Sequence, residues 1–394
     1  MAKSRSALIL DIRSDSVGGA FVESRFDFST KSLRTRVTKF TRQVFNLQEV
    51  LDTQRLFNEL AEALKLLINN LAKDFPKRKF DRIECFLSAP FYAGQTRTIK
   101  QTYDKPTIIT ERAITKLINQ DLESFERDAP PLYREIVHDA HEIIERKVMQ
   151  IKLNRYLTCS PYGKTAREIS IDHYVSVSSK QILSRLREII STRFDPRKMR
   201  FHSFPFVFFS LARDYLGAEN VFLLDIGGEV TELSLIAGGI LWETASFPHG
   251  YNFLARLLAA NLKTTSEEAL SSLKLYGRGD QNKETSDKIG EAITSGRSEW
   301  LSYFKEALTV LTEEHLGSDR LLAIGLPDVS KIFLNWLGKE SFSEYLFTGR
   351  SLRAGSITQT TLEEGSRRKL PGPADDQHLL LSSVFYDKLI TLSK

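Results

Sequence analysis

The stretch VFLLDIGGEVTELSLIAGG, residues 221–239, decides the fold that this chain is expected to adopt. Its pattern predicts a buried strand, a tight turn and a return strand over residues 230–236. Asp225 stands where the first strand ends, and Gly227 and Gly228 let backbone N–H groups approach a ligand because neither residue has a Cβ. Such a turn suits a phosphate with its metal ion. A plain hairpin between core strands is the alternative.

Residues 7–23, ALILDIRSDSVGGAFVE, repeat this order near the start of the chain. An apolar strand ends at Asp11, a small polar turn contains Ser14, Asp15 and Ser16, and a glycine pair leads into a return strand. Two hairpins with aspartate at the same place predict a duplicated unit that holds a phosphate between its copies. Two unrelated core hairpins are the alternative reading.

Composition limits the classes of protein to consider. The 394 residues are too many for one compact core and predict about two to four subdomains. The 55 basic and 50 acidic residues are dispersed, and a net charge of only +5 argues against a nucleic-acid partner. Cys85 and Cys159 form no CxxC motif, so a reducing cytoplasm is expected. The longest apolar run, residues 204–212, is too short to span a membrane, so any membrane contact is expected to be peripheral or through a partner.

The order of predicted elements is that of an α/β protein. Residues 50–75 carry apolar side chains spaced for one buried helix face, and residues 82–91 predict the next strand. A polar segment over residues 26–41 separates this helix from the first hairpin.

A small α+β insertion is expected from residue 92 to about residue 168, where the chain becomes more charged. It begins with a helix near Thr110, continues as a helical run to Lys147 and ends with strands. In that run His138 and His141 would lie one helical turn apart. Ordinary exposed histidines are favoured over metal ligands because no third ligand cluster follows.

After the central hairpin the pattern predicts a strand that ends at residues 248–250, followed by two helices. Thr265 and Glu268 have the chemistry of a capping box for the second helix. Residues 321–337 predict a strand and a helix, and residues 351–376 predict a mobile loop. The last helix is expected to pack on the first lobe, and it lacks the basic face of a membrane-surface anchor.

Several of these segments resemble the motifs of a known protein superfamily. The hairpins LDIRSDSVGGAFVE and LLDIGGEVTELSLIAGG resemble the first and second phosphate motifs of the actin-like nucleotide-binding superfamily. The segment SFPHGYNFLARLLAANLKTTSEEALSSLKLYG and the insertion LNRYLTCSPYGKTAREISIDHYVSVS are similar to the corresponding regions of the FtsA and PilM families. The resemblance implies an actin-like (ribonuclease H-like) duplicated fold. Its expected parts are a first lobe (1–91), an FtsA/PilM-type insertion subdomain (92–168), a return to the first lobe (169–217), a second lobe (218–375) and a C-terminal helix (376–394).

The resemblance also implies a site for ATP and Mg²⁺. The metal would lie between Asp11 and Asp225, the expected catalytic pair, and would be bound through water, because magnesium keeps several of its waters. The expected nucleotide-binding positions are Ser14, Asp15, Ser16, Gly227, Gly228, Thr231, Lys274 and Gly325.

The sequence departs from the family pattern at several of these positions. Arg13 stands where the family usually has glycine, and Glu229 replaces the third glycine of the second motif. The adenosine motif reads AIGLPDVSKIF, so only Gly325 is left of its glycine run. Ser271 takes the place of the acidic partner expected one turn before Lys274. These departures predict at most a slow ATPase.

The resemblance implies two functions. An FtsA-type protein would be a cytoplasmic, membrane-associated adaptor or polymer in bacterial cell division, with self-association. A PilM-type protein would be a type IV pilus adaptor whose insertion binds a peptide of an inner-membrane partner. The lack of a clear C-terminal linker favours the PilM type, and the SPYGK turn favours the FtsA type. A small-molecule kinase and a nucleotide-free pseudo-ATPase are further alternatives, although no acidic residue is placed as a base for a substrate hydroxyl.

Overall fold

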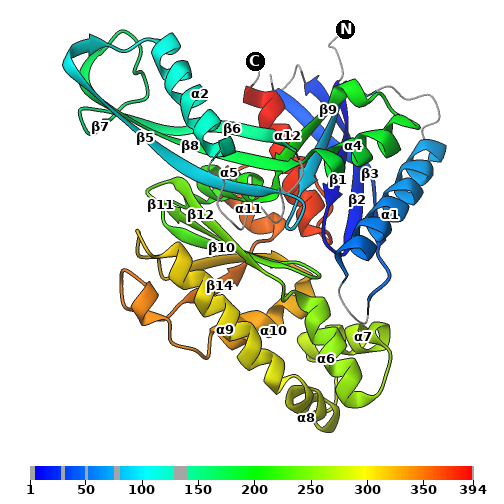
Figure 1. Cartoon of the computed structure of the whole chain (residues 1–394). Helices are drawn as coiled ribbons and strands as arrows, with labels where there is room; N and C mark the ends of the chain where they lie inside the picture. The colour runs from blue at the N-terminus through cyan, green and yellow to red at the C-terminus, as the bar shows by residue number, and fades with distance from the viewer. Residues whose placement is uncertain (1–4, 28–31, 49–51, 75–79, 128–139, 393–394) are drawn as a thin grey trace.

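The computed structural model describes residues 5–27, 32–48, 52–74, 80–127 and 140–392. These residues form two lobes and an insertion, each built on its own sheet (Figure 1). His138, one of the two histidines of the expected helical run, lies outside the described residues.

The first lobe contains a five-stranded sheet in the order β3-β2-β1-β4-β9. Strands β1, β2 and β3 are antiparallel neighbours, whereas β4 and β9 continue the sheet in parallel with β1. The side chains of β1 alternate between two cores. Leu8 and Leu10 pack under α1 and α4, while Ala7 and Ile9 pack under α5 and α12. The elements are β1 (Arg5–Ile12), β2 (Ser16–Asp27), β3 (Ser32–Val44), β4 (Arg82–Leu87), β9 (Met199–Ser203), α1 (Thr53–Asp74), α4 (Lys180–Ser191), η1 (Pro196–Lys198), α5 (Phe204–Leu216) and α12 (Gln377–Leu392).

The second lobe repeats this sheet in the order β12-β11-β10-β13-β14, with the same pattern of antiparallel and parallel neighbours. β10 therefore corresponds to β1, and β13 corresponds to β4. The predicted duplication of the hairpin is thus a duplication of the whole sheet. The elements are β10 (Val221–Ile226), β11 (Thr231–Ala237), β12 (Ile240–Phe247), β13 (Arg320–Gly325), β14 (Arg353–Ser356), α6 (Tyr251–Leu262), α7 (Ser266–Arg278), α8 (Lys283–Ala292), α9 (Thr294–Leu311), α10 (Pro327–Leu337), η2 (Ser343–Tyr345) and α11 (Gln359–Ser366).

The insertion enters between β4 and β9 and forms a four-stranded sheet in the order β5-β8-β6-β7. Its elements are β5 (Ala93–Ile108), α2 (Glu111–Arg127), β6 (His141–Leu153), β7 (Tyr156–Leu157) and β8 (Thr165–Ser179). The predicted helical run to Lys147 is wrong, because β6 begins at His141 and pairs with β8. His141 therefore does not lie on a helix one turn from His138. The Glu, Arg and Lys residues of this segment favour a helix locally, but pairing with a long neighbouring strand outweighs that preference.

Two further segments differ from the sequence reading. Residues 32–41 of the expected polar segment belong to edge strand β3, which carries several basic side chains that suit a sheet edge. Residues 351–376, expected to be a mobile loop, contain β14 and α11. The capping box at Thr265 and Glu268 is confirmed at the start of α7.

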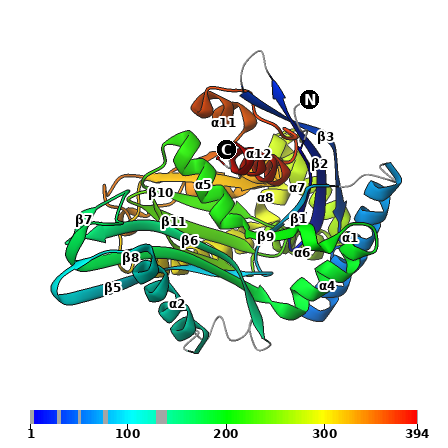
Figure 2. The ribbon, with the colours of Figure 1, turned by 90° about the horizontal axis from the view of Figure 1, so that it is seen from above.

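The C-terminal helix α12 packs on the first lobe. It lies beside β1, β2 and α5 and also contacts β13 of the second lobe (Figure 2). In the part of the chain that the structure describes, no helix has the length and apolar character needed to cross a membrane.

A buried histidine joins the insertion to the first lobe. His202 on β9 is hydrogen bonded to Glu84 on β4 at 2.9 Å and to Glu145 on β6 at 3.1 Å. Burial lowers the pKa of His202, but hydrogen bonds and charge from Glu145 and Glu84 outweigh burial and raise it to about 9. The imidazolium therefore holds two buried carboxylates of different subdomains together.

We expect stability to fall as this histidine loses its proton. Because the pKa in the folded state is about 9, above the ordinary value of about 6.5, its contribution is complete below about pH 6.5 and is lost as pH rises through about 9. An NMR titration of the histidine rings, assigned with His202→Gln, should show one ring with a midpoint near this value. A titration midpoint of the His202 ring at or below the ordinary pKa of histidine would contradict the raised pKa.

Candidate functional site

The two predicted catalytic aspartates occupy equivalent positions in the two sheets. Asp11 is the second-last residue of β1, and Asp225 is the second-last residue of β10. Both are buried, with 0% and 7% of their surface exposed. The carboxyl ends of parallel strands are where ligands bind in open α/β sheets. The structure therefore brings the two halves of the predicted site to corresponding places.

The two phosphate turns touch each other directly. Ser14 Oγ accepts a hydrogen bond from the backbone N–H of Glu229 at 3.1 Å. A Cβ on Gly228 would overlap the side chain of Asp15, so the second turn fits against the first only because residue 228 is glycine. Asp15 also accepts a hydrogen bond from the hydroxyl of Tyr251 at the start of α6. The predicted phosphate-binding residues are thus brought together, but they bind one another.

Arg13 fills the space beside Asp225. Its Nη1 lies 2.9 Å from Nδ1 of His378, and His378 Nε2 lies 2.9 Å from Asp225 Oδ1. A guanidinium only donates hydrogen bonds, so this order requires that Nδ1 accepts and that Nε2–H donates to Asp225. The Arg13 guanidinium is also 3.8 Å from Asp225 and 3.7 Å from Asp15. Burial raises the pKa of Asp225, but the hydrogen bond from His378 and the charges of Arg13 and Arg42 outweigh burial and lower it.

Arg42, which projects from β3, neutralises the other aspartate. Its Nη2 donates to Asp11 Oδ2 at 2.6 Å, and its Nη1 donates to Ser16 Oγ at 2.9 Å. The same guanidinium donates to both carboxylate oxygens of Asp376, at 2.7 and 2.9 Å. Asp376 in turn accepts from the backbone N–H of Leu379 and caps α12. Ser16, expected to face a phosphate, therefore faces an arginine.

Gly227, Gly325 and Thr231 also have internal partners. The backbone N–H of Gly227 donates to Val230 O, and that of Gly325 donates to Gln377 Oε1, each at 3.0 Å. The Thr231 hydroxyl donates to His249 O at 2.7 Å. Lys274 borders a cavity of about 270 Å³ that Ser14 and Asp15 also line.

The end of α7 packs closely against the start of α10. A Cβ on Gly277 of α7 would overlap the backbone carbonyl of Asp328 in α10. The side chains of Arg278 and Asp328 form an ion pair at 2.7 Å across the same contact. The two helices therefore pack backbone to backbone at this contact.

Arg42, Asp376 and His378 were not among the site residues predicted from the sequence. Arg42 lies on an edge strand among several other basic residues, so nothing in the local pattern distinguished it. Asp376 did carry a signal, because an aspartate directly before an apolar helix is typical of an N-cap. His378 had none, since its partner Asp225 is 153 residues away.

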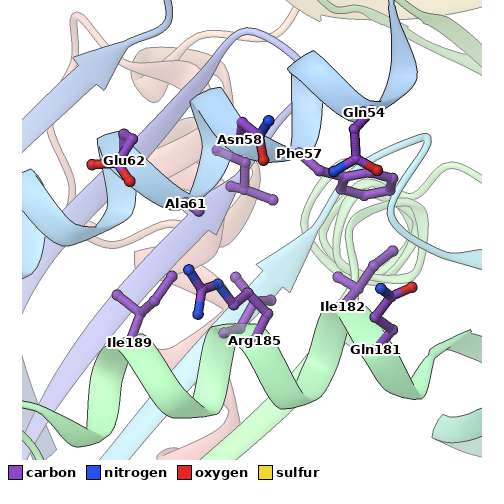
Figure 3. Close-up of a pocket in the computed structure, with 11 residues that line it drawn as sticks. Gln54, Phe57, Asn58, Ala61, Glu62, Gln181, Ile182, Arg185 and Ile189 are labelled. Carbon is purple, nitrogen blue, oxygen red and sulfur yellow. The ribbon is translucent and has the colours of Figure 1, made fainter.

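A second feature of the first lobe is a groove between α1 and α4. It has a volume of about 320 Å³ (Figure 3). Its floor is apolar, and the exposed side chains of Asn58 and Arg185 stand at its rim on opposite helices. The lining residues are Gln54, Phe57, Asn58, Leu60, Ala61, Glu62, Gln181, Ile182, Arg185, Leu186 and Ile189.

Solved structures share this fold. The chain is similar to a chain of the PilM–PilN type IV pilus biogenesis complex, with a TM-score of 0.58, 14% identity and coverage of 98% of this chain and 97% of that one. Weaker likenesses include the ethanolamine utilization protein EutJ from Carboxydothermus hydrogenoformans, with a TM-score of 0.40, 9% identity and coverage of 98% and 90%. Another is MreB 5 of Spiroplasma citri bound to AMPPNP, with a TM-score of 0.37, 10% identity and coverage of 92% and 95%. No protein-family model matches the sequence, and no curated protein matches it. The fold is the duplicated actin-like ATPase fold, as predicted.

Proteins with this fold generally bind ATP with Mg²⁺, but the residues as arranged here do not fit that complex. Magnesium needs carboxylates that can orient its waters, whereas Asp11 and Asp225 face guanidinium and imidazole groups. The turns that would straddle a triphosphate are in contact. Among the described residues there is no cluster of three or more His, Cys, Asp or Glu side chains suited to a metal ion.

We expect Arg42→Ala to lose about 3–5 kcal/mol of unfolding free energy, because it leaves Asp11 buried without its cation. Urea denaturation at neutral pH measures this loss. The control is Arg197→Ala, which removes an ion pair whose arginine side chain is 88% exposed and should change stability little. The double variant Arg42→Ala/Asp11→Asn should recover part of the loss. If Arg42→Ala were as stable as the control Arg197→Ala, the role of Arg42 would be refuted.

Proposed function

From the actin-like fold that it shares with the PilM–PilN complex, we propose that this chain is a PilM-type adaptor. In this role it is a scaffold that binds a short segment of a partner protein, and it does not turn over a small-molecule substrate. The observation that carries the proposal is the match over nearly the full length of both chains, insertion included. The partner is proposed to be a membrane protein, through which the adaptor would reach the inner membrane from the cytoplasm.

The internal partners of the two aspartates support a scaffold over an enzyme. A kinase or an efficient ATPase needs groups that can reach a bound phosphate, and the carboxylates of Asp11 and Asp225 already have internal partners. An FtsA-type division scaffold that polymerises is the second candidate, because FtsA carries the same type of insertion in the resemblance described above. Self-association distinguishes the two.

The resemblance assigns the peptide of a PilM-type partner to the insertion, whereas we place the partner segment in the groove between α1 and α4. The groove combines an apolar floor, formed by residues such as Leu60, Ile182 and Leu186, with polar groups at its edges. Binding sites for short peptides have this composition, since apolar contact supplies affinity and polar groups fix orientation. The groove also lies beside the point where the chain leaves the insertion, because α4 directly follows β8. A segment bound there would sense the position of the insertion.

The groove gives a direct test of the adaptor role. Short peptides are selected from a displayed library on the full chain, and their affinities are measured by fluorescence polarisation. Asn58→Trp, which fills the groove from its exposed rim, should weaken the selected peptides by about tenfold or more. Asn70→Trp is the matched control, because Asn70 is an exposed asparagine of the same helix that does not line the groove.

Each outcome decides between the candidates. Loss of binding in Asn58→Trp alone supports the adaptor. Peptides that bind both variants equally well, or a library that yields no binder, would reject the groove as the docking site. Filaments of the wild-type chain in sedimentation and electron microscopy, without peptide binding, would favour the FtsA-type scaffold instead.

A further inference from the structure

Three consecutive residues at the start of α12 join the two lobes. Asp376 binds Arg42 on β3 of the first lobe. Gln377 accepts a hydrogen bond from the backbone N–H of Gly325, at the end of β13 in the second lobe, and donates to Ile357 O at 2.6 Å. His378 links Asp225 on β10 to Arg13, which directly follows β1. The first turn of α12 thus forms hydrogen bonds with residues near the strand ends of both sheets.

The first turn of α12 is buried in the interior of the protein. Gln377 is 7% exposed and His378 is 1% exposed. The ring of His378 also lies against the ring of Phe204 in α5, with centroids 4.8 Å apart. Packing therefore fixes the imidazole on its face, while hydrogen bonds fix it at both nitrogens. A side chain held in this way has little freedom to move aside for a ligand.

Each carboxylate at this place has a hydrogen-bond donor from within the chain. Asp11, Asp15, Asp225 and Asp376 supply carboxylates, and each has a donor: Arg42 for Asp11 and Asp376, Tyr251 for Asp15 and His378 for Asp225. A divalent cation between two lobes would hold two carboxylates by charge. Guanidinium and imidazole groups hold the same carboxylates here, and the planar guanidinium does so in fixed directions.

We propose that Arg13, Arg42 and residues 376–378 form an internal latch that takes the place of a metal–nucleotide complex. The latch holds the two lobes in one arrangement, so the surface that the chain presents to partners does not depend on nucleotide. This inference does not rest on the adaptor role, because it concerns only the contacts between the lobes. In this proposal the N-terminal turn of α12 acts as an intramolecular ligand that binds between the two lobes.

Hydrogen–deuterium exchange on the full chain tests the latch in two steps. The first step compares wild-type protein alone, with Mg²⁺ and ATP, and with EDTA. We expect the peptides that cover residues 10–17 and 225–231 to be equally protected in all three conditions, and calorimetry to detect no ATP binding. Protection that increases with Mg²⁺ and ATP and is reversed by EDTA would overturn the proposal.

The second step removes the latch. His378→Ala should raise the exchange rate of both turns by about tenfold or more, because the two lobes lose one of their bridges. Arg197→Ala, which removes an exposed ion pair, is the control and should leave both turns unchanged. If His378→Ala does not fold, His378→Gln provides the comparison, since an amide can both accept and donate and should give a smaller increase. Unchanged protection of both turns in the folded variant would refute the latch.

Discussion

The structure depends on the burial of two carboxylates at equivalent strand ends. Asp11 and Asp225 are removed from water by the sheets that carry them, and a buried carboxylate is costly unless hydrogen-bond donors or cations face it. Arg42 and His378 supply these groups directly, with Arg13 close to Asp225. This requirement accounts for several features at once. Strand β3 must extend far enough to bring Arg42 to the site, and α12 must begin at the point where the two lobes meet.

The same arrangement illustrates that a fold does not determine the chemistry of its site. Function resides in sites that a fold carries, so an actin-like fold does not by itself imply ATP turnover. Here the strand ends of the fold are used for internal packing, and the phosphate turns bind each other through Ser14 and the backbone of Glu229. Surfaces outside the cleft are then left for partners. The groove between α1 and α4 is such a surface, and its shape depends on two helices that belong to one lobe.

Local patterns in the sequence were sufficient to predict most of the architecture. Both hairpins, the strand and helix at 321–337 and the cap at Thr265 depend on neighbouring residues, and all were predicted. Several failures involved partners that are distant in the chain. Strand β6 is held by pairing with β8, which overrides the helical preference of its charged residues. The interactions of Arg42 with Asp376 and of His378 with Asp225 span 334 and 153 residues, and no local pattern encodes such contacts.

The position of α12 in the chain has a consequence for biosynthesis. All strands of both sheets precede α12, so both lobes leave the ribosome before the residues that join them. Until Asp376 and His378 emerge, Arg42 lacks one of its two carboxylate partners, and Asp225 lacks the hydrogen bond that His378 donates. Domains generally fold as units during synthesis, and their final docking follows. The order of translation therefore makes the junction of the lobes a late step, which the newly made helix α12 completes.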